Sequence, residues 1–95
     1  MLTSKQRAYL IKLSNDIKAQ YQIGKGDIGE NHKKLINDAL EAKELIKIKV
    51  LDNAMVSAKE ACAELAELTD AEPVKVIGNI IILYKESKNN KKIRL

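Results

Sequence analysis

The segment with the clearest chemical potential is the glycine-rich stretch Gly24-Lys25-Gly26-Asp27-Ile28-Gly29. It stands between a short predicted strand and the start of a predicted helix, where backbone N–H groups have no partner within the helix. Together with the helix dipole, such N–H groups form an anion site, and glycines let a phosphate backbone approach closely. Lys25 adds a positive charge at the tip of the loop. This arrangement is typical of a Gly-X-X-Gly loop that holds the backbone of single-stranded RNA.

The same loop also has a simpler explanation. A turn between a strand and a helix is often rich in glycine without binding anything, and on the loop alone this explanation is favoured. The segment is too short for a nucleotide-binding P-loop and lacks the Gly-Lys-Ser/Thr ending of that motif.

Other side chains offer little for catalysis or metal binding. His32 is the only histidine, so two imidazoles cannot meet at one metal ion. Cys62 lies on the expected buried face of a helix, which favours a core thiol over a nucleophile. Most carboxylates alternate with lysines, as on solvated helix faces. We therefore expect no catalytic residue, no metal ligand, no cofactor and no small-molecule substrate.

Composition bounds the class of protein. The 95 residues are 45% hydrophobic and 32% charged, which suits one globular domain and excludes a disordered chain. Without Phe or Trp, the core must be aliphatic. A single cysteine forms no intramolecular disulfide and fits a reducing compartment. Since no hydrophobic run reaches the roughly 18–20 residues that cross a bilayer, and the N-terminus does not resemble a signal peptide, we expect a cytoplasmic protein that does not contact membranes. We also expect it to be a monomer.

The net charge of +4 comes almost entirely from the two ends of the chain. Residues 1–25 contain five basic residues and one acidic residue, and residues 83–95 have the same balance. Residues 61–82 contain one lysine and four acidic residues. If the two ends meet in space, they form one basic face that suits a polyanionic partner. Two separately solvated termini are the alternative, and the charge alone does not choose between them.

The spacing of hydrophobic residues predicts the elements that would position these groups. Thr3-Ser4-Lys5-Gln6 has the form of a helix capping box, and hydrophobic residues then recur at three- and four-residue steps as far as Ile17. Tyr21-Gln22-Ile23 indicates a short strand, which leads into the glycine-rich stretch. A second helix is predicted from Glu30 to Ala42.

The second half of the chain adds one helix and three strands. Residues Glu44 to Val50 alternate between hydrophobic and charged, as in a half-buried strand. A third helix is predicted from about Ala54 to Leu68, and Pro73 prevents its continuation. Val74 to Tyr84 reads as a hairpin around Gly78-Asn79, with a type II′ or I′ turn.

These elements predict an α/β fold with the order α-β-α-β-α-β-β, a two-layer sandwich with a four-stranded mixed sheet. The polar residues 85–95 are expected to form a mobile basic tail. No linker or internal repeat divides the chain, so residues 1–95 are expected to form a single domain.

Several separated motifs resemble the CRM domain (chloroplast RNA splicing and ribosome maturation) in its stand-alone bacterial form, the YhbY family. The motifs occur in the family's order and are Leu2–Leu10, Gln22–Gly26, Ala39–Lys47, Val76–Ile80 and Leu83–Lys85. The resemblance covers essentially the whole sequence. It implies an RNA-binding protein that associates with ribosomal RNA in precursors of the large ribosomal subunit, assists ribosome assembly and catalyses no reaction.

The resemblance also implies which residues contact RNA. Gly24, Lys25 and Gly26 match the first three positions of the family's Gly-X-X-Gly loop, whereas Asp27 stands in place of its second glycine. A carboxylate at Asp27 would weaken a phosphate contact, although Asp tolerates the positive φ of such a turn. Basic residues of the first helix would extend the contact, namely Lys5, Arg7, Lys12 and Lys18. Apart from the resemblance, Lys47 and Lys49 of the second strand are candidate contacts, although exposed lysines on a strand also protect a sheet from aggregation. The tail residues Lys85, Lys88, Lys91, Lys92 and Arg94 would add a flexible, mostly non-specific electrostatic attraction.

A protein-interaction module is the rival class of function. Such a module would bind its partner through the acidic third helix or a sheet edge, without direct contact to RNA. The two classes differ in a simple measurement, because a protein that contacts phosphates loses affinity for RNA steeply as salt rises.

Overall fold

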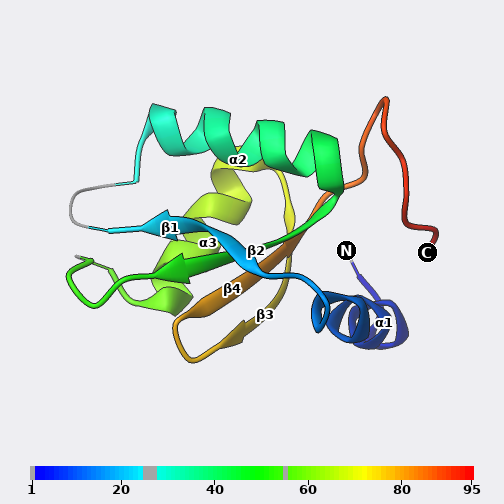
Figure 1. Ribbon diagram of the computed structural model, residues 1–95, viewed down its shortest axis with the longest axis horizontal. Coiled ribbons are helices and arrows are strands. Elements are labelled where there is room, and N and C mark those ends of the chain that lie inside the picture. The colour runs from blue at the N-terminus through cyan, green and yellow to red at the C-terminus, as the bar shows by residue number, and fades with distance from the viewer. Residues whose placement is uncertain (1, 25–27, 55) are drawn as a thin grey trace.

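The predicted order of elements is confirmed in the computed structural model of the protein, which describes residues 2–24, 28–54 and 56–95 (Figure 1). The elements are α1 (Ser4–Ser14), β1 (Ala19–Ile23), α2 (Glu30–Lys43), β2 (Leu45–Val50), α3 (Ala58–Thr69), β3 (Glu72–Ile77) and β4 (Ile80–Tyr84). The four strands form one sheet in the order β1-β2-β4-β3. β1 and β2 are parallel, with α2 as the crossover, and the other pairs are antiparallel, so the sheet is mixed as predicted.

The two faces of the sheet pack against different helices. Ile46, Ile48 and Val50 of β2 belong to the core beneath α2 and α3. Leu45 points to the other face, where it shares a second cluster with Leu10 of α1. This alternation is the period of two that the sequence of the strand indicates. The helices α2 and α3 therefore cover one face of the sheet, while α1 packs on the opposite face near one end of the strands (Figure 1).

The α1 capping box is confirmed, but the helix is shorter than its hydrophobic pattern. The Thr3 hydroxyl accepts the N–H of Gln6 at 3.0 Å, and the Gln6 side chain accepts the N–H of Thr3 at 3.0 Å. At the other end, the Ser14 hydroxyl donates to the carbonyl of Ile11 at 2.6 Å, and the helix ends there. Ile17 still packs against the α1 cluster from the following turn, which explains why the pattern continues beyond the helix.

The third helix begins later than predicted. Ser57 is its N-cap, because the Ser57 hydroxyl accepts the N–H of Glu60 at 3.2 Å and the Glu60 carboxylate accepts the N–H of Ser57 at 3.4 Å. The helix ends at Thr69, and Asp70 follows in the left-handed conformation with φ of 55°. Thus α3 is terminated by its own C-cap before the chain reaches Pro73.

The backbone of the turn between β3 and β4 distinguishes the two predicted turn types, II′ and I′. Gly78 has φ of +56°, while Asn79 is not among the described residues with positive φ. A type I′ turn needs positive φ at both central residues, and a type II′ turn needs it only at the first. The Gly78-Asn79 turn therefore matches type II′.

Cys62 lies in the core between α3 and the sheet, where it is 5% exposed. Burial raises the pKa of its thiol above the ordinary value, so the thiolate is disfavoured. We expect Cys62→Ala to lower the free energy of unfolding by about 1 kcal/mol, because it leaves only a small cavity. Urea denaturation of the two proteins measures this difference. A loss of RNA affinity in Cys62→Ala without a loss of stability would contradict a purely structural role.

Candidate nucleic-acid interface

The two described ends of the glycine-rich stretch lie at the end of the sheet farthest from α1 (Figure 1). Gly24 follows β1, and the N–H of Leu51 donates to the carbonyl of Ile23 at 2.8 Å, so β1 and β2 end together there. A β-carbon at Gly24 would lie 3.4 Å from Cδ1 of Leu51, which is an ordinary van der Waals contact. Lys25, Gly26 and Asp27, which the sequence analysis places in the RNA-binding loop, lie outside the described residues.

Gly29 forms the N-cap of α2. It has no side chain to cap the helix, and its own N–H donates to Nδ1 of His32 at 3.3 Å. Its φ of −142° is ordinary extended backbone, and a β-carbon there would meet nothing within 4 Å. The histidine is thus engaged at the helix start rather than in the core, beside the N–H groups of the first turn that could face an anion.

The basic residues of the first helix lie at the other end of the sheet. Lys5 and Lys12 on α1 are exposed, Arg7 is half-buried, and Lys18 is exposed just before β1. The helix packs on Leu45 and Tyr84, which pair at the end of β2 opposite to the loop. The six residues of β2 span about 17 Å, with α1 at one end and the glycine-rich loop at the other. The site inferred from the family resemblance therefore consists of two separate groups of residues, the cations of α1 and the loop.

Two lysines of β2 lie between these groups. Lys47 and Lys49 point to the same face of the sheet as Leu45, since side chains alternate along a strand. Lys47 is partly exposed beside Ile82 of the α1 cluster, and Lys49 is exposed and pairs with Gln22, two residues before Gly24. The α1 lysines, the β2 lysines and Gly24 therefore follow one another across a single face, which the sequence pattern alone could not show.

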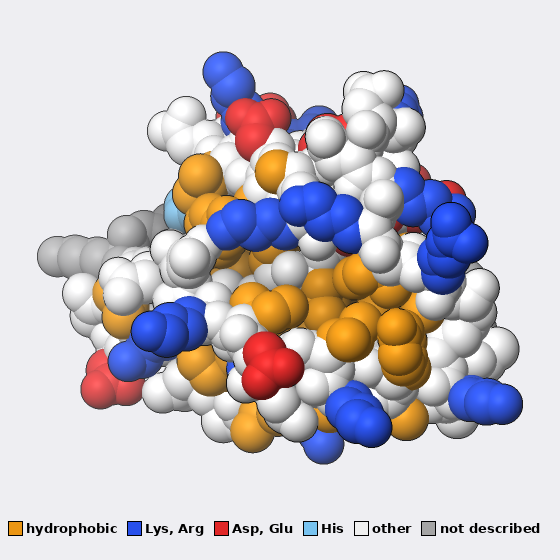
Figure 2. All heavy atoms as spheres, turned by 45° about the vertical axis from the view of Figure 1, so that its right-hand side comes forward, with side chains coloured by type: hydrophobic (Ala, Val, Ile, Leu, Met, Phe, Trp, Pro, Cys, Tyr) orange, Lys and Arg blue, Asp and Glu red, His pale blue; other side chains and the backbone are white. Residues whose placement is uncertain are grey.

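The two basic ends of the chain lie side by side, as the first of the two alternatives requires, rather than as two separately solvated termini. Ile93 near the C-terminal end packs in the same cluster as Leu2 and Leu10. Beyond it, Arg94 and Leu95 lie beside α1. Figure 2 shows this side of the molecule, where hydrophobic side chains gather in the middle. Most of the charged side chains around them are Lys and Arg, and an acidic side chain lies at their lower edge.

The segment after β4, which its polar composition predicts to be mobile, is held in one position by hydrogen bonds to Glu44. This residue connects α2 to β2 and is fully buried. Its carboxylate accepts the backbone N–H groups of Ser87 at 2.8 Å, Lys92 at 2.6 Å and Ile93 at 2.7 Å. Burial raises the pKa of Glu44, but these hydrogen bonds and the charge of Lys91 outweigh it, so the pKa lies below its ordinary value.

Glu41, one helical turn earlier, holds the same segment from the surface of α2. Its carboxylate accepts the N–H of Lys88 at 2.9 Å, the hydroxyl of Ser87 at 2.8 Å and the N–H of Asn89 at 3.0 Å. These bonds, led by that of Lys88, lower its pKa to about 2. Sequence reasoning missed both glutamates as positioning residues, although they lie within the Ala39–Lys47 motif of the family resemblance.

We expect this pair of carboxylates to make the fold sensitive to acid. Their pKa values are lower in the folded chain, so their ionised forms stabilise it fully above the ordinary value of about 4.5. The free energy of unfolding should therefore fall as pH decreases from about 4.5 toward the folded pKa of Glu41, about 2. Urea denaturation over this pH range should show a shallower fall for Glu41→Gln than for the natural sequence. An unchanged pH dependence in that variant would contradict the assignment.

A second surface lies on the helix-covered side. Glu64, Glu67 and Leu68 of α3 line a hollow with Ile28 and Lys33. This acidic face and the two sheet edges, β1 and β3, are where the rival protein-interaction class would place its partner. Within the described ranges, no helix is long and hydrophobic enough to span a membrane, and no three His, Cys, Asp or Glu side chains are grouped to hold a metal ion.

The arrangement defines a small α/β domain whose mixed sheet carries α2 and α3 on one face, and α1 together with the lysines of β2 on the other. The chain belongs to the CRS1/YhbY (CRM) domain family, whose sequence model matches residues 2–85. The family resemblance found in the sequence is thereby confirmed.

Three similar proteins show how far the likeness extends. Probable RNA-binding protein YqeI of Bacillus subtilis is 42% identical over 95 residues, covering all of this chain and 99% of the relative. An RNA-binding protein of Haemophilus influenzae is 29% identical over 90 residues, 95% of this chain and 91% of its own length. The solution structure of a hypothetical Staphylococcus aureus protein, proposed to bind RNA, has a TM-score of 0.82 and 50% identity, covering all of this chain and 99% of that one.

Proposed function

We propose that this protein binds ribosomal RNA in precursors of the large ribosomal subunit and assists assembly of that subunit. The observation that carries the proposal is that cations of α1 and β2 lie on one face of the sheet. They extend across this face toward Gly24, where the glycine-rich loop begins. The names of the similar proteins support RNA as the partner, and membership of the CRM family supports the ribosomal role.

The chemistry of this face is that of phosphate binding. Exposed lysines such as Lys12 and Lys49 attract phosphates without reading sequence. At the loop end of the sheet, the N-terminus of α2 adds backbone N–H groups that have no partner within the helix. We place Lys25, Gly26 and Asp27 of the loop in this contact on the family resemblance. The protein would act by binding rather than by catalysis, in the cytoplasm, where a reducing environment suits its free, buried Cys62.

Titration of a large-subunit ribosomal RNA fragment at two salt concentrations tests RNA binding. The affinity should fall steeply with salt, with a logarithmic slope of roughly −0.7 for each phosphate contacted in a single strand. Absence of binding at low salt by the folded protein would reject the proposal and favour a protein partner.

A second experiment tests the ribosomal role. On a sucrose gradient of a cell lysate, the protein should sediment with large-subunit precursors at low salt and leave them at high salt. Sedimentation only at the top of the gradient under both conditions would reject the ribosomal role and leave RNA binding in general as a separate question.

A further inference from the structure

The three tyrosines of the chain have different surroundings. Tyr84 is 7% exposed in the α1 cluster. Tyr21 is partly buried, and Nζ of Lys43 lies 5.6 Å from its ring centroid. Tyr9 on α1 is 46% exposed and is the most exposed aromatic side chain of the three. An exposed aromatic ring in a chain with so few aromatic residues invites a specific explanation.

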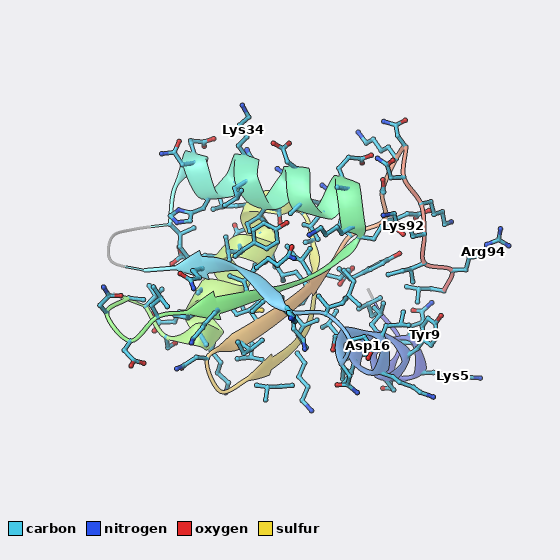
Figure 3. All side chains as sticks on the ribbon, in the orientation of Figure 1. Lys5, Tyr9, Asp16, Lys34, Lys92 and Arg94 are labelled. Carbon is cyan, nitrogen blue, oxygen red and sulfur yellow. The ribbon has the colours of Figure 1, made fainter. Side chains whose placement is uncertain are left out.

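Tyr9 lines a small hollow between α1 and the end of the chain. The hollow measures about 250 Å³, and its lining is Lys5, Gln6, Tyr9, Arg94 and Leu95. Its surface is mostly nonpolar, and the charged side chains that line it are both cations. Figure 3 shows Lys5, Tyr9 and Arg94 at the same end of the molecule, whereas Lys34 points away from α2 on another side.

The two walls of the hollow are held in place by contacts described above. On one side, α1 is anchored through Leu10, which is fully buried against the sheet. On the other side, the N–H of Ile93 donates to the buried carboxylate of Glu44 at 2.7 Å, and the Ile93 side chain packs in the α1 cluster. Arg94 follows directly, so these contacts at Ile93 hold the backbone of Arg94 beside α1, where Arg94 lines the hollow with Tyr9.

We propose that this hollow binds one unstacked base of single-stranded RNA. The base stacks on the ring of Tyr9, and Lys5 and Arg94 contact the phosphates on either side of it. Single-stranded RNA is recognised by stacking of splayed bases on aromatic side chains and on Arg guanidinium planes, with nearby cations for the backbone. This inference rests on the proposed function and adds a preference for unpaired RNA.

Charge and shape favour this occupant over a hydrophobic protein segment. A nonpolar floor bordered by two cations suits a ligand that joins a planar ring to negative charges. A nucleotide has both features. A hydrophobic peptide would leave Lys5 and Arg94 without partners of opposite charge at the border of the contact.

The test compares a short single-stranded RNA with its own duplex. Fluorescence anisotropy gives the affinity of the natural sequence, Tyr9→Phe and Tyr9→Leu for both forms. Tyr9→Leu keeps a hydrophobic side chain but removes the aromatic face. It should weaken binding of the single strand about fivefold or more, as for loss of one stacked base, and leave duplex binding within twofold. Tyr9→Phe should retain the affinity for both.

Intrinsic fluorescence adds a readout that a purely structural role would not affect. The chain has no tryptophan, so its emission comes from the three tyrosines. Stacking of a base on Tyr9 should quench part of this emission, and Tyr9→Leu should lose that part of the quenching. Urea denaturation of each variant confirms that the fold is retained.

The outcomes separate this inference from the proposed function. If the natural sequence binds no RNA at low salt, the proposed function fails and this inference fails with it. If the natural sequence binds RNA but Tyr9→Leu binds the single strand equally well, RNA binding stands and the base site is rejected. Equal weakening of single strand and duplex would also reject it, because a stacked base is available only in the single strand.

Discussion

Replacing Glu44 by alanine is expected to lower the free energy of unfolding by about 2–4 kcal/mol and to detach the C-terminal segment from α2. The Glu44 carboxylate is the buried acceptor for three backbone N–H groups, those of Ser87, Lys92 and Ile93. A buried donor without an acceptor costs about 1–3 kcal/mol, although detachment of the segment would let water reach some of these groups. Urea denaturation at pH 7 measures the change in stability.

A second substitution separates the carboxylate from the backbone at this position. Glu44 has φ of +65°, in the region that favours glycine. Glu44→Gly would remove the backbone strain and the carboxylate together, whereas Glu44→Ala removes only the carboxylate. We expect Glu44→Gly to be less destabilised than Glu44→Ala but still less stable than the natural sequence.

Hydrogen exchange identifies the cause directly. The amides of Ser87, Lys92 and Ile93 should exchange faster in both Glu44 variants, because they lose the same acceptor. If Glu44→Gly were as stable as the natural sequence, or if these amides kept their protection, the carboxylate would not be what holds the segment.

The clamp shows why the end of the chain could not be placed from its sequence. Residues 85–95 are polar and basic, and such a composition indicates a solvated segment because it has few hydrophobic side chains to bury. The segment is instead held by hydrogen bonds to Glu41 and Glu44, more than forty residues earlier in the chain. Periodicity records which face of an element is buried, but it does not record which backbone groups a distant carboxylate accepts.

Local signals were more informative for the helices. The Thr3 capping box is visible as a four-residue pattern and is confirmed atom by atom. The true start of α3 had the same kind of signal, because Ser57 is followed three residues later by Glu60, yet the hydrophobic pattern favoured a start at Ala54. Where the two signals compete, the capping box marks the boundary, because it satisfies the N–H groups that a helix leaves free at its start.

The sequence predicted the individual residues of the candidate site, but it did not predict how they are arranged on one surface. The sequence indicated the loop, the α1 lysines and the β2 lysines as separate groups. Their order across one sheet face depends on the packing of α1 against Leu45 and on the parallel pairing of β1 with β2, and both are long-range contacts. In the structure, Lys47 and Lys49 lie between the α1 lysines and the glycine-rich loop, so they connect the two predicted parts of the site.

Reversing the charge of both connecting lysines should weaken RNA binding at 0.1 M salt by about tenfold or more. Lys47→Glu/Lys49→Glu removes two attractions and adds two repulsions in the middle of the proposed path from α1 to the loop. If each lysine contacts one phosphate of a single strand, the logarithmic salt slope should become shallower by about 1.4. Titrations of one ribosomal RNA fragment at several salt concentrations give both quantities.

A matched variant on the other face controls for net charge. Lys34 on α2 and Lys59 on α3 are exposed on the helices that cover the opposite face of the sheet, so Lys34→Glu/Lys59→Glu makes the same change in charge away from the path. We expect this control to lose much less affinity, because exposed charges beyond about 10 Å are largely screened at 0.1 M salt. Equal losses in the two double variants would mean that RNA responds only to the total charge of the protein. In that case the sheet face would not be the binding surface, even if the protein binds ribosomal RNA.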